Sequence, residues 1–95
     1  MHETFIWFYL SIVEKYSPDI KVIDISGNHI SPRVCEVVKE ILTKVELKSL
    51  KMANTNLKSK GLAMVCLGLA QNTSLIELDL NYNDFGKTLK VIFKP

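Results

Sequence analysis

The sequence predicts an α/β solenoid in which a short parallel sheet of about three strands forms the concave side and helices form the convex side. One spacing pattern supports this fold: apolar residues three, five and ten positions after a first apolar residue, with a polar residue eight positions after it. The pattern starts at Ile20, Leu47 and Leu75. A fixed period of this length indicates stacked repeats. Helix-forming segments follow the first two patterns, so each full repeat should supply a strand and a helix.

Composition limits the class of protein. The chain has 95 residues, of which 47% are hydrophobic and 23% charged, which predicts one small folded domain. A formal net charge of +2 is too weak to indicate a nucleic-acid-binding domain. The two cysteines lie in apolar stretches and fit a reducing compartment. The apolar run 5–13 is shorter than the ~20 residues that span a bilayer. We therefore expect a cytoplasmic protein without a membrane segment, with cytoskeletal or ciliary assemblies as further candidate settings.

Residues 1–18 predict an amphipathic, aromatic helix that acts as a cap or as part of a preceding repeat. One apolar stripe should face the repeats and consists of Ile6, Tyr9, Leu10 and Val13. The other apolar residues should form a second, outer surface: Phe5, Trp7, Phe8 and Ile12. This outer surface predicts a protein interface. The alternative is a helix that folds back so that Trp7 packs inward.

Repeat 1 is expected to occupy residues 19–46. Its strand should run from about 20 to 26, because apolar and polar residues alternate there. Asn28 follows where the chain turns toward the helix, and its amide can bond backbone groups. Ser31 is a candidate N-cap and Pro32 suits the first turn of a helix over 32–45.

Repeat 2 is expected to occupy residues 47–74, with a strand at 47–53, Thr55 in the turn and a helix at 59–71. One helix stripe should be buried and consists of Leu62, Val65, Cys66 and Leu69. No charged residue occurs from Gly61 to Ala70, so Met64 and Leu67 should form an outer apolar surface that a partner covers. The segment Asn72-Thr73-Ser74 matches a glycosylation pattern, but a turn is the favoured interpretation.

Residues 75–95 predict a partial third repeat and a C-terminal tail. A strand at 75–81 should end in a turn at Asn83, whose amide should bond backbone groups. The segment after Phe85 does not read as a complete helix. Instead, Leu89, Val91 and Phe93 fall on one side of a possible strand, which predicts a cap or an unfinished edge.

The segment GLAMVCLGLAQNTSLIELDLNYNDFG resembles the ribonuclease-inhibitor-like leucine-rich repeats, in which the helix ends in an Asn-x-Ser/Thr-Leu turn before the next strand. The resemblance covers Ile20 to about Gly86. It implies a non-catalytic protein-interaction or scaffold module, as part of a larger protein or a multi-subunit assembly. The alternative is a regulatory module of an enzyme system, such as a GTPase-activating protein of the Ran type. In that case Arg33, the single arginine, would have to reach a nucleotide.

Outward-pointing strand positions should align across the repeats, so that Asp24, Lys51 and Asp79 form one row. Opposite charges in such a row either stabilise the sheet or form a docking surface with Tyr82 at its rim. Together with the helical surfaces, the candidate protein-binding residues are Phe5, Trp7, Phe8, Ile12, Asp24, Lys51, Met64, Leu67, Glu77, Asp79 and Tyr82.

Catalytic and ligand-binding signals are weak. Gly86-Lys87-Thr88 resembles the end of a phosphate-binding loop, but Asn81 stands where that motif needs its first glycine. The cysteines and histidines do not have the spacing of metal ligands. We therefore expect no enzyme activity, no cofactor, no metal and no nucleic-acid partner.

Overall fold

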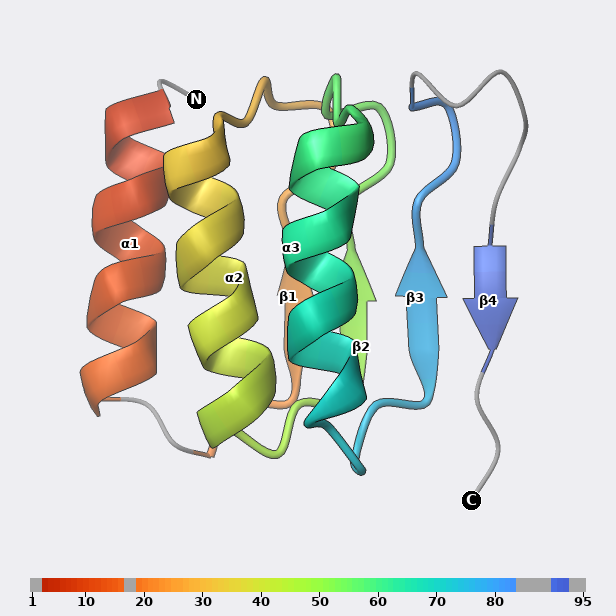
Figure 1. Cartoon of the computed structure of the whole chain (residues 1–95). Coiled ribbons are helices and arrows are strands. Elements are labelled where there is room, and N and C mark those ends of the chain that lie inside the picture. Colours follow the sequence, from red (N-terminus) through yellow and green to blue (C-terminus); the bar gives the residue numbers. More distant parts are fainter. Residues whose placement is uncertain (1–2, 17–18, 84–89, 93–95) are drawn as a thin grey trace.

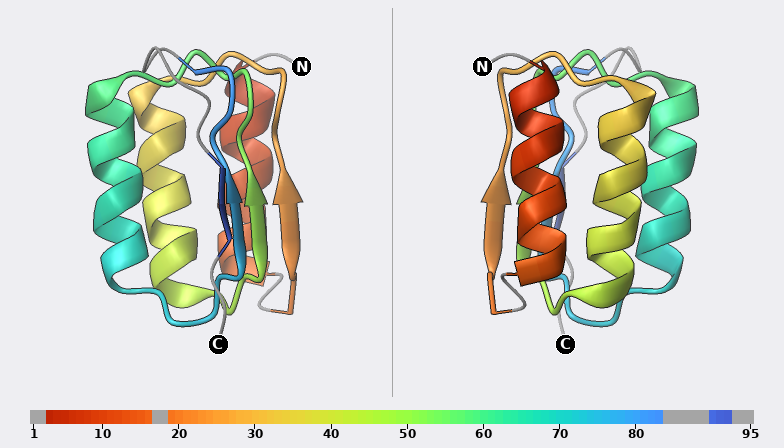
Figure 2. Two further views of the ribbon diagram at one scale, coloured as in Figure 1. Left: turned by 90° about the vertical axis from the view of Figure 1, so that its right-hand side faces the viewer. Right: turned by 90° about the vertical axis from the view of Figure 1, so that its left-hand side faces the viewer.

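The computed structural model describes residues 3–16, 19–83 and 90–92, in which helices lie against one face of a four-stranded sheet (Figure 1). The helices are α1 (Glu3–Tyr16), α2 (Pro32–Lys44) and α3 (Ser59–Ala70). The strands are β1 (Val22–Asp24), β2 (Ser49–Lys51), β3 (Glu77–Asp79) and β4 (Lys90–Ile92), in the order β1-β2-β3-β4. Figure 2 shows α2 and α3 in a layer beside the strands, whereas α1 overlaps the strands at the β1 end in both views.

The repeat pattern correctly predicts the parallel part of the sheet. β1 pairs with β2 and β2 with β3 in parallel, and Ile23, Leu50 and Leu78 face one another across the three strands. These three leucine or isoleucine side chains are at most 3% exposed and point toward the helices. The core therefore lies between the strands and the helix layer.

Each regular strand is three residues long, shorter than the seven predicted. Backbone hydrogen bonds nevertheless continue between the repeats on both sides of the strands. Before them, Lys48 N donates to Lys21 O at 2.8 Å; after them, Ile25 N donates to Lys51 O at 2.9 Å and Gly27 N to Ala53 O at 2.8 Å. The predicted segments are thus hydrogen-bonded over most of their length, although only their central parts are regular strands.

β4 differs from the other strands because it runs antiparallel to β3, with Leu78 opposite Val91. It lies at the edge of the sheet next to β3 (Figure 1). The antiparallel strand confirms that the tail contains a strand, whereas a continued repeat would have supplied a parallel one. Leu89 and Phe93, which were predicted to share a face with Val91, lie outside the described residues.

The α2–α3 contact is built on two glycines of α3. A Cβ added at Gly68 would lie 3.0 Å from the Cα and the carbonyl oxygen of Lys39, and one at Gly61 would lie 2.9 Å from Cys35 Sγ of α2. Such distances leave no room for a methyl group without movement of a neighbour. The helices approach closely because these positions lack side chains.

The Asn72 side chain forms the turn between α3 and β3. Its Nδ2 donates to Leu42 O at 2.9 Å, and its Oδ1 accepts from Leu75 N at 2.8 Å and Ser74 N at 3.0 Å. Ser74 Oγ donates to Leu47 O at 2.7 Å. The amide is therefore used inside the fold, which confirms the predicted turn.

Candidate functional site

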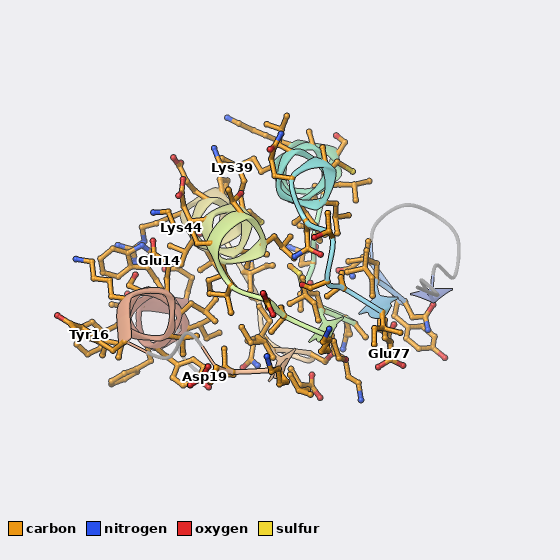
Figure 3. The ribbon with its side chains drawn as sticks, turned by 90° about the horizontal axis from the view of Figure 1, so that it is seen from below. Glu14, Tyr16, Asp19, Lys39, Lys44 and Glu77 are labelled. Atoms are coloured by element: carbon orange, nitrogen blue, oxygen red, sulfur yellow. The ribbon has the colours of Figure 1, made fainter. Side chains whose placement is uncertain are left out.

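One face of α1 carries a continuous row of exposed apolar side chains. Its members recur at helical spacing and are 41% to 76% exposed: Phe5, Phe8, Tyr9, Ile12 and Tyr16. We call this set the α1 stripe. The inward face contains Ile6, Leu10 and Val13, which are buried in the core. Figure 3 shows Tyr16 pointing away from α2 and the sheet.

Two assignments on α1 were wrong. Trp7 was predicted on the outer surface, but it is half-buried and packs against the core beside α2. Position 7 lies about 200° around a helix from position 5, so the two side chains cannot share a face. Tyr9 was predicted to face the repeats, but it is 49% exposed and belongs to the α1 stripe.

Polar contacts hold α1 against α2 at both ends. At the start, Arg33 Nη2 lies 2.9 Å from Glu3 Oε1, and the Ser31 hydroxyl donates to the same carboxylate. The Ser31 side chain thus serves this contact and makes no side-chain capping bond to α2. At the other end, Lys44 Nζ lies 3.6 Å from Glu14 Oε1, and both side chains lie between the two helices in Figure 3. These contacts keep the α1 stripe on the outer side.

The Arg33 guanidinium also lies over the Trp7 ring, 4.6 Å from its centroid. The Trp7 ring thus packs against the core and also makes a cation–π contact with Arg33. Trp7 and Val37 line a groove of about 280 Å³ between α1 and α2 whose other lining residues are Ser11, Glu14, Lys15, Glu36 and Glu40. This α1–α2 groove has a mixed apolar and charged lining and shares no residue with the α1 stripe.

On the sheet face, Asp24, Lys51 and Asp79 form the predicted row. Asp24 Oδ1 accepts from Ser26 N at 3.0 Å, and Asp79 Oδ1 accepts from Asn81 N at 3.0 Å. The hydrogen bonds from the Ser26 backbone and side chain, together with the charge of Lys51, lower the pKa of Asp24. Both acids therefore help to form the turns after their strands, in addition to charging the surface.

Ser49 and Glu77, on neighbouring strands of the sheet, are joined by a side-chain hydrogen bond. Ser49 is buried, and its hydroxyl donates to Glu77 Oε1 at 2.9 Å. Lys51, Glu77 and Asp79 are half-buried, whereas Asp24 is exposed. Neighbouring strands shield the central row, so the accessible part of the predicted docking surface is narrower than alternation suggests.

Tyr82 stands at the rim of this face with a left-handed backbone, at φ 60°, and a side chain 76% exposed. The same slot of the earlier repeats holds Gly27, at φ 79°, and Asn54, at φ 53°. Glycine and asparagine tolerate this conformation, whereas a bulky aromatic residue there is an outlier. Strain at an exposed aromatic residue is a feature of binding sites and favours Tyr82 as a contact residue.

Asn83 organises the last described turn, as predicted. Its Oδ1 accepts from Leu57 N at 2.8 Å and from Thr55 N at 3.0 Å. Its Nδ2 donates to Met52 O at 2.8 Å and Leu80 O at 3.1 Å. These bonds connect the second and third repeats and place Tyr82 at the rim.

The outer side of α3 only partly matches the prediction. Leu67 is 61% exposed, but Met64 is half-buried and packs against the core. Cys66, which was assigned to the buried stripe, is exposed. Of the predicted stripe, Val65 is buried and Leu62 and Leu69 are half-buried against the core. Gly61 and Gly68 complete the buried face at the close approach to α2.

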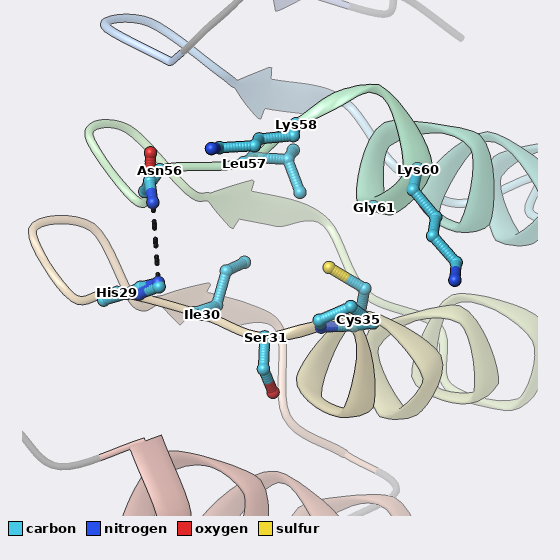
Figure 4. A pocket seen from close by; sticks show the side chains of 10 residues that line it. His29, Ile30, Ser31, Cys35, Asn56, Leu57, Lys58, Lys60 and Gly61 are labelled. Carbon is cyan, nitrogen blue, oxygen red and sulfur yellow. Dashed lines mark hydrogen bonds between the residues drawn. The ribbon is translucent and has the colours of Figure 1, made fainter.

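Sequence reasoning missed a groove between the loops that follow β1 and β2 (Figure 4). It has a volume of about 380 Å³ and is bordered by the starts of α2 and α3. Its lining residues are His29, Ile30, Ser31, Pro32, Cys35, Asn56, Leu57, Lys58, Lys60 and Gly61. One signal in the sequence could have predicted this groove: its lining includes residues at equivalent positions of successive repeats, which stack. These pairs are His29 with Asn56 and Ile30 with Leu57.

Within the described residues, no group of three or more histidine, cysteine, aspartate or glutamate side chains is arranged to hold a metal ion. In the same part of the chain, each helix is too short or too polar to cross a membrane. The phosphate-loop-like Gly86-Lys87-Thr88 lies outside the described residues.

A family model described as leucine-rich repeat matches residues 71–88, which include the Asn72 turn, β3 and the Asn83 turn. No curated protein matches the chain. The family match, the α/β layers and the three parallel strands support a leucine-rich repeat protein. Repeats of this kind generally form protein-binding surfaces.

Proposed function

We propose that this chain is a non-catalytic protein-interaction module of a cytoplasmic assembly, built as a solenoid of ribonuclease-inhibitor-like leucine-rich repeats. The observation that carries the proposal is the α1 stripe, which aligns four aromatic residues and Ile12 on an exposed helix face. Soluble monomers rarely expose large contiguous apolar patches, and aromatic side chains are enriched among the residues that dominate binding energy. The α1 stripe is therefore the main binding surface in this proposal.

The shape of the α1 stripe favours an elongated partner element. From Phe5 to Tyr16 the stripe runs along about 16 Å of helix, at 1.5 Å per residue. Within this chain α1 already packs lengthwise on α2, through Trp7 and Leu10 among other residues. A partner helix with an apolar face would pack against the opposite side of α1 in the same way. We propose such a helix, from another protein, as the occupant.

The regulatory alternative has less support. A GTPase activator of the Ran type would need Arg33 free to reach a nucleotide. Here the Arg33 guanidinium pairs with the Glu3 carboxylate and stacks over the Trp7 ring, so it connects α1 with α2. These contacts give Arg33 a structural role that does not require a nucleotide.

Photocrosslinking in the full-length protein tests the proposal. A photoreactive amino acid at position 8, in the α1 stripe, is compared with one at position 67, which is also exposed and apolar. We expect position 8 to crosslink to one protein, which then binds the purified chain and fails to bind its Phe8→Ser/Ile12→Ser variant. A crosslinked protein whose affinity is the same for that variant, or the absence of any crosslinked protein at position 8, would overturn the proposal.

A further inference from the structure

The groove between the β1 and β2 loops is apolar inside and basic at its rim. Ile30, Leu57 and Cys35 are at most 5% exposed and form its floor. In Figure 4 the Cys35 Sγ points toward Leu57 and Gly61, inside the groove. Burial raises the pKa of this thiol to about 11, so Cys35 is neutral at physiological pH and behaves as an apolar side chain.

The rim carries positive charge from several sources. Lys58 and Lys60 are exposed and extend from the start of α3 in different directions (Figure 4). The groove also faces the first turns of α2 and α3, where backbone N–H groups add partial positive charge. None of the described lining residues is acidic. Glu3, which contacts Ser31 from the α1 side, is paired with Arg33.

From these features we infer that the groove binds an acidic peptide segment of a partner protein, with one apolar side chain inserted between Ile30 and Leu57. Charge complementarity determines the class of ligand: carboxylates of the segment lie near Lys58 and Lys60 while the apolar side chain covers the floor. The volume of about 380 Å³ is within the range of about 300–1,000 Å³ that is usual for ligand pockets.

The apolar floor argues against a free inorganic anion as the occupant. Such an ion would give up hydration without covering the apolar lining of the groove. A peptide side chain removes that surface from water, and carboxylates on either side remain near solvent and the lysines. His29 and Asn56, whose side chains approach within 3.4 Å, close one end of the groove and provide polar contacts for a peptide backbone.

The groove shares no residue with the α1 stripe, so it is a second site that goes beyond the proposed function. Loss of binding at one surface therefore leaves binding at the other measurable. An experiment on the groove can therefore disprove peptide binding there without affecting the proposal for the α1 stripe, and an experiment on the stripe can do the reverse.

Fluorescence anisotropy with designed peptides tests the inference on the full chain. The first labelled peptide has one leucine flanked by glutamates; the second replaces that leucine by serine; the third replaces the glutamates by lysines. The protein variant is Lys58→Glu/Lys60→Glu, and the matched control is Lys15→Glu/Lys21→Glu, which makes the same change in net charge at exposed lysines away from the groove. Circular dichroism checks that both variants are folded.

We expect the glutamate–leucine peptide to bind the unmodified protein, and the other two peptides to bind it at least about tenfold more weakly. The glutamate–leucine peptide should lose a similar factor in affinity for Lys58→Glu/Lys60→Glu and none for the control variant. Added salt should weaken binding to the unmodified protein, which supplies a second measurement if the groove variant does not fold. Equal binding of all three peptides, no binding up to millimolar protein, or full competition by inorganic phosphate would overturn the inference. Concentration-dependent self-association that Lys58→Glu/Lys60→Glu abolishes, without peptide binding, would assign the groove to a second copy and overturn it as well.

Discussion

At the residue scale, two adjacent slots of each repeat control the turn after the strand. The first slot has a left-handed backbone and holds Gly27, Asn54 or Tyr82. The second holds Asn28, Thr55 or Asn83, and its side chain bonds nearby backbone groups in every repeat. The role of the second slot could be predicted, because a polar residue recurs inside an apolar pattern. The left-handed backbone of the first slot could not be predicted at position 82, because tyrosine, unlike glycine and asparagine, gives no signal for positive φ.

Replacing Tyr82 by glycine should stabilise the protein. Glycine adopts φ near 60° without the steric cost of about 1–2 kcal/mol that other L-residues carry, and the tyrosine ring is 76% exposed, so few contacts are lost. We expect the free energy of unfolding to rise by about 1 kcal/mol in urea denaturation. Tyr82→Ala is the matched control, because alanine retains the steric cost. Equal stability of the glycine and alanine variants would contradict the assigned strain.

Replacing Asn83 by alanine should destabilise the protein strongly. The change leaves the buried N–H groups of Thr55 and Leu57 and the carbonyl of Met52 without this partner, and such losses cost about 1–3 kcal/mol each before relaxation and water entry. Thermal unfolding should show a larger decrease than for Asn28→Ala, whose half-buried amide bonds the carbonyls of Ile25 and Ser26. A melting temperature equal to that of the unmodified protein would rule out the role of Asn83.

Asp24 should titrate below its ordinary pKa because Ser26 donates to its carboxylate and Lys51 lies on the next strand. A carboxylate with a lowered folded-state pKa contributes stability above its unfolded pKa, and that contribution is lost as pH falls through the folded pKa. NMR titration of the Asp24 carboxyl carbon measures the shift directly. Lys51→Ala should raise the pKa of Asp24 part of the way back, whereas Lys15→Ala, on α1, should not. An unchanged pKa in Lys51→Ala would exclude the cross-strand charge effect.

At the element scale, the bounds of α2 and α3 agree closely with the predicted segments, whereas the buried face of α3 agrees only in part. The apolar run from Gly61 to Ala70 has no polar face, so hydrophobic periodicity cannot select the buried side. The buried side of α3 is determined by close packing against α2 at Gly61 and Gly68. This packing leaves Cys66 exposed and Met64 half-buried.

Replacing Gly68 by alanine tests this packing. At an exposed helical position alanine is more stable than glycine by about 0.5–1 kcal/mol. At position 68 the added methyl would lie 3.0 Å from the Lys39 backbone, and overpacking of this kind costs about 1–3 kcal/mol. We expect Gly68→Ala to lower the free energy of unfolding in urea denaturation.

Ala63→Gly, at an exposed position of the same helix, is the control. It should also destabilise, so that alanine is preferred at 63 and glycine at 68. A Gly68→Ala protein that is more stable than the unmodified chain would show that α3 does not depend on this close approach.

At the scale of the whole molecule, the repeat spacing predicted the parallel pairing and register, because equivalent residues of successive repeats must lie opposite one another. It could not predict the direction of β4, since the tail does not continue the pattern. It also could not predict the groove, which forms only when the loops after β1 and β2 stack. The α1 stripe was partly predicted: Phe5, Phe8 and Ile12 are exposed, whereas Trp7 packs against the core beside α2.

The two proposed surfaces give the molecule different modes of recognition. The α1 stripe is apolar and suits a packed helix, whereas the loop groove combines an apolar floor with basic side chains. Salt should therefore weaken binding at the groove much more than binding at the stripe. This difference follows from the chemistry of the two surfaces and does not depend on the identity of the partners.

The most direct test of the central claim is the dissociation constant of the crosslinked partner for the Phe5→Ser/Phe8→Ser/Ile12→Ser variant, measured by isothermal titration calorimetry. The three side chains are 41% to 67% exposed in the isolated chain, so the variant should keep its circular dichroism spectrum and its melting temperature. We predict affinity at least about a hundredfold weaker, because truncation of a single dominant interface residue costs about 2 kcal/mol or more. A folded variant with unchanged affinity, or a variant that unfolds because these side chains belong to the core, would contradict the claim.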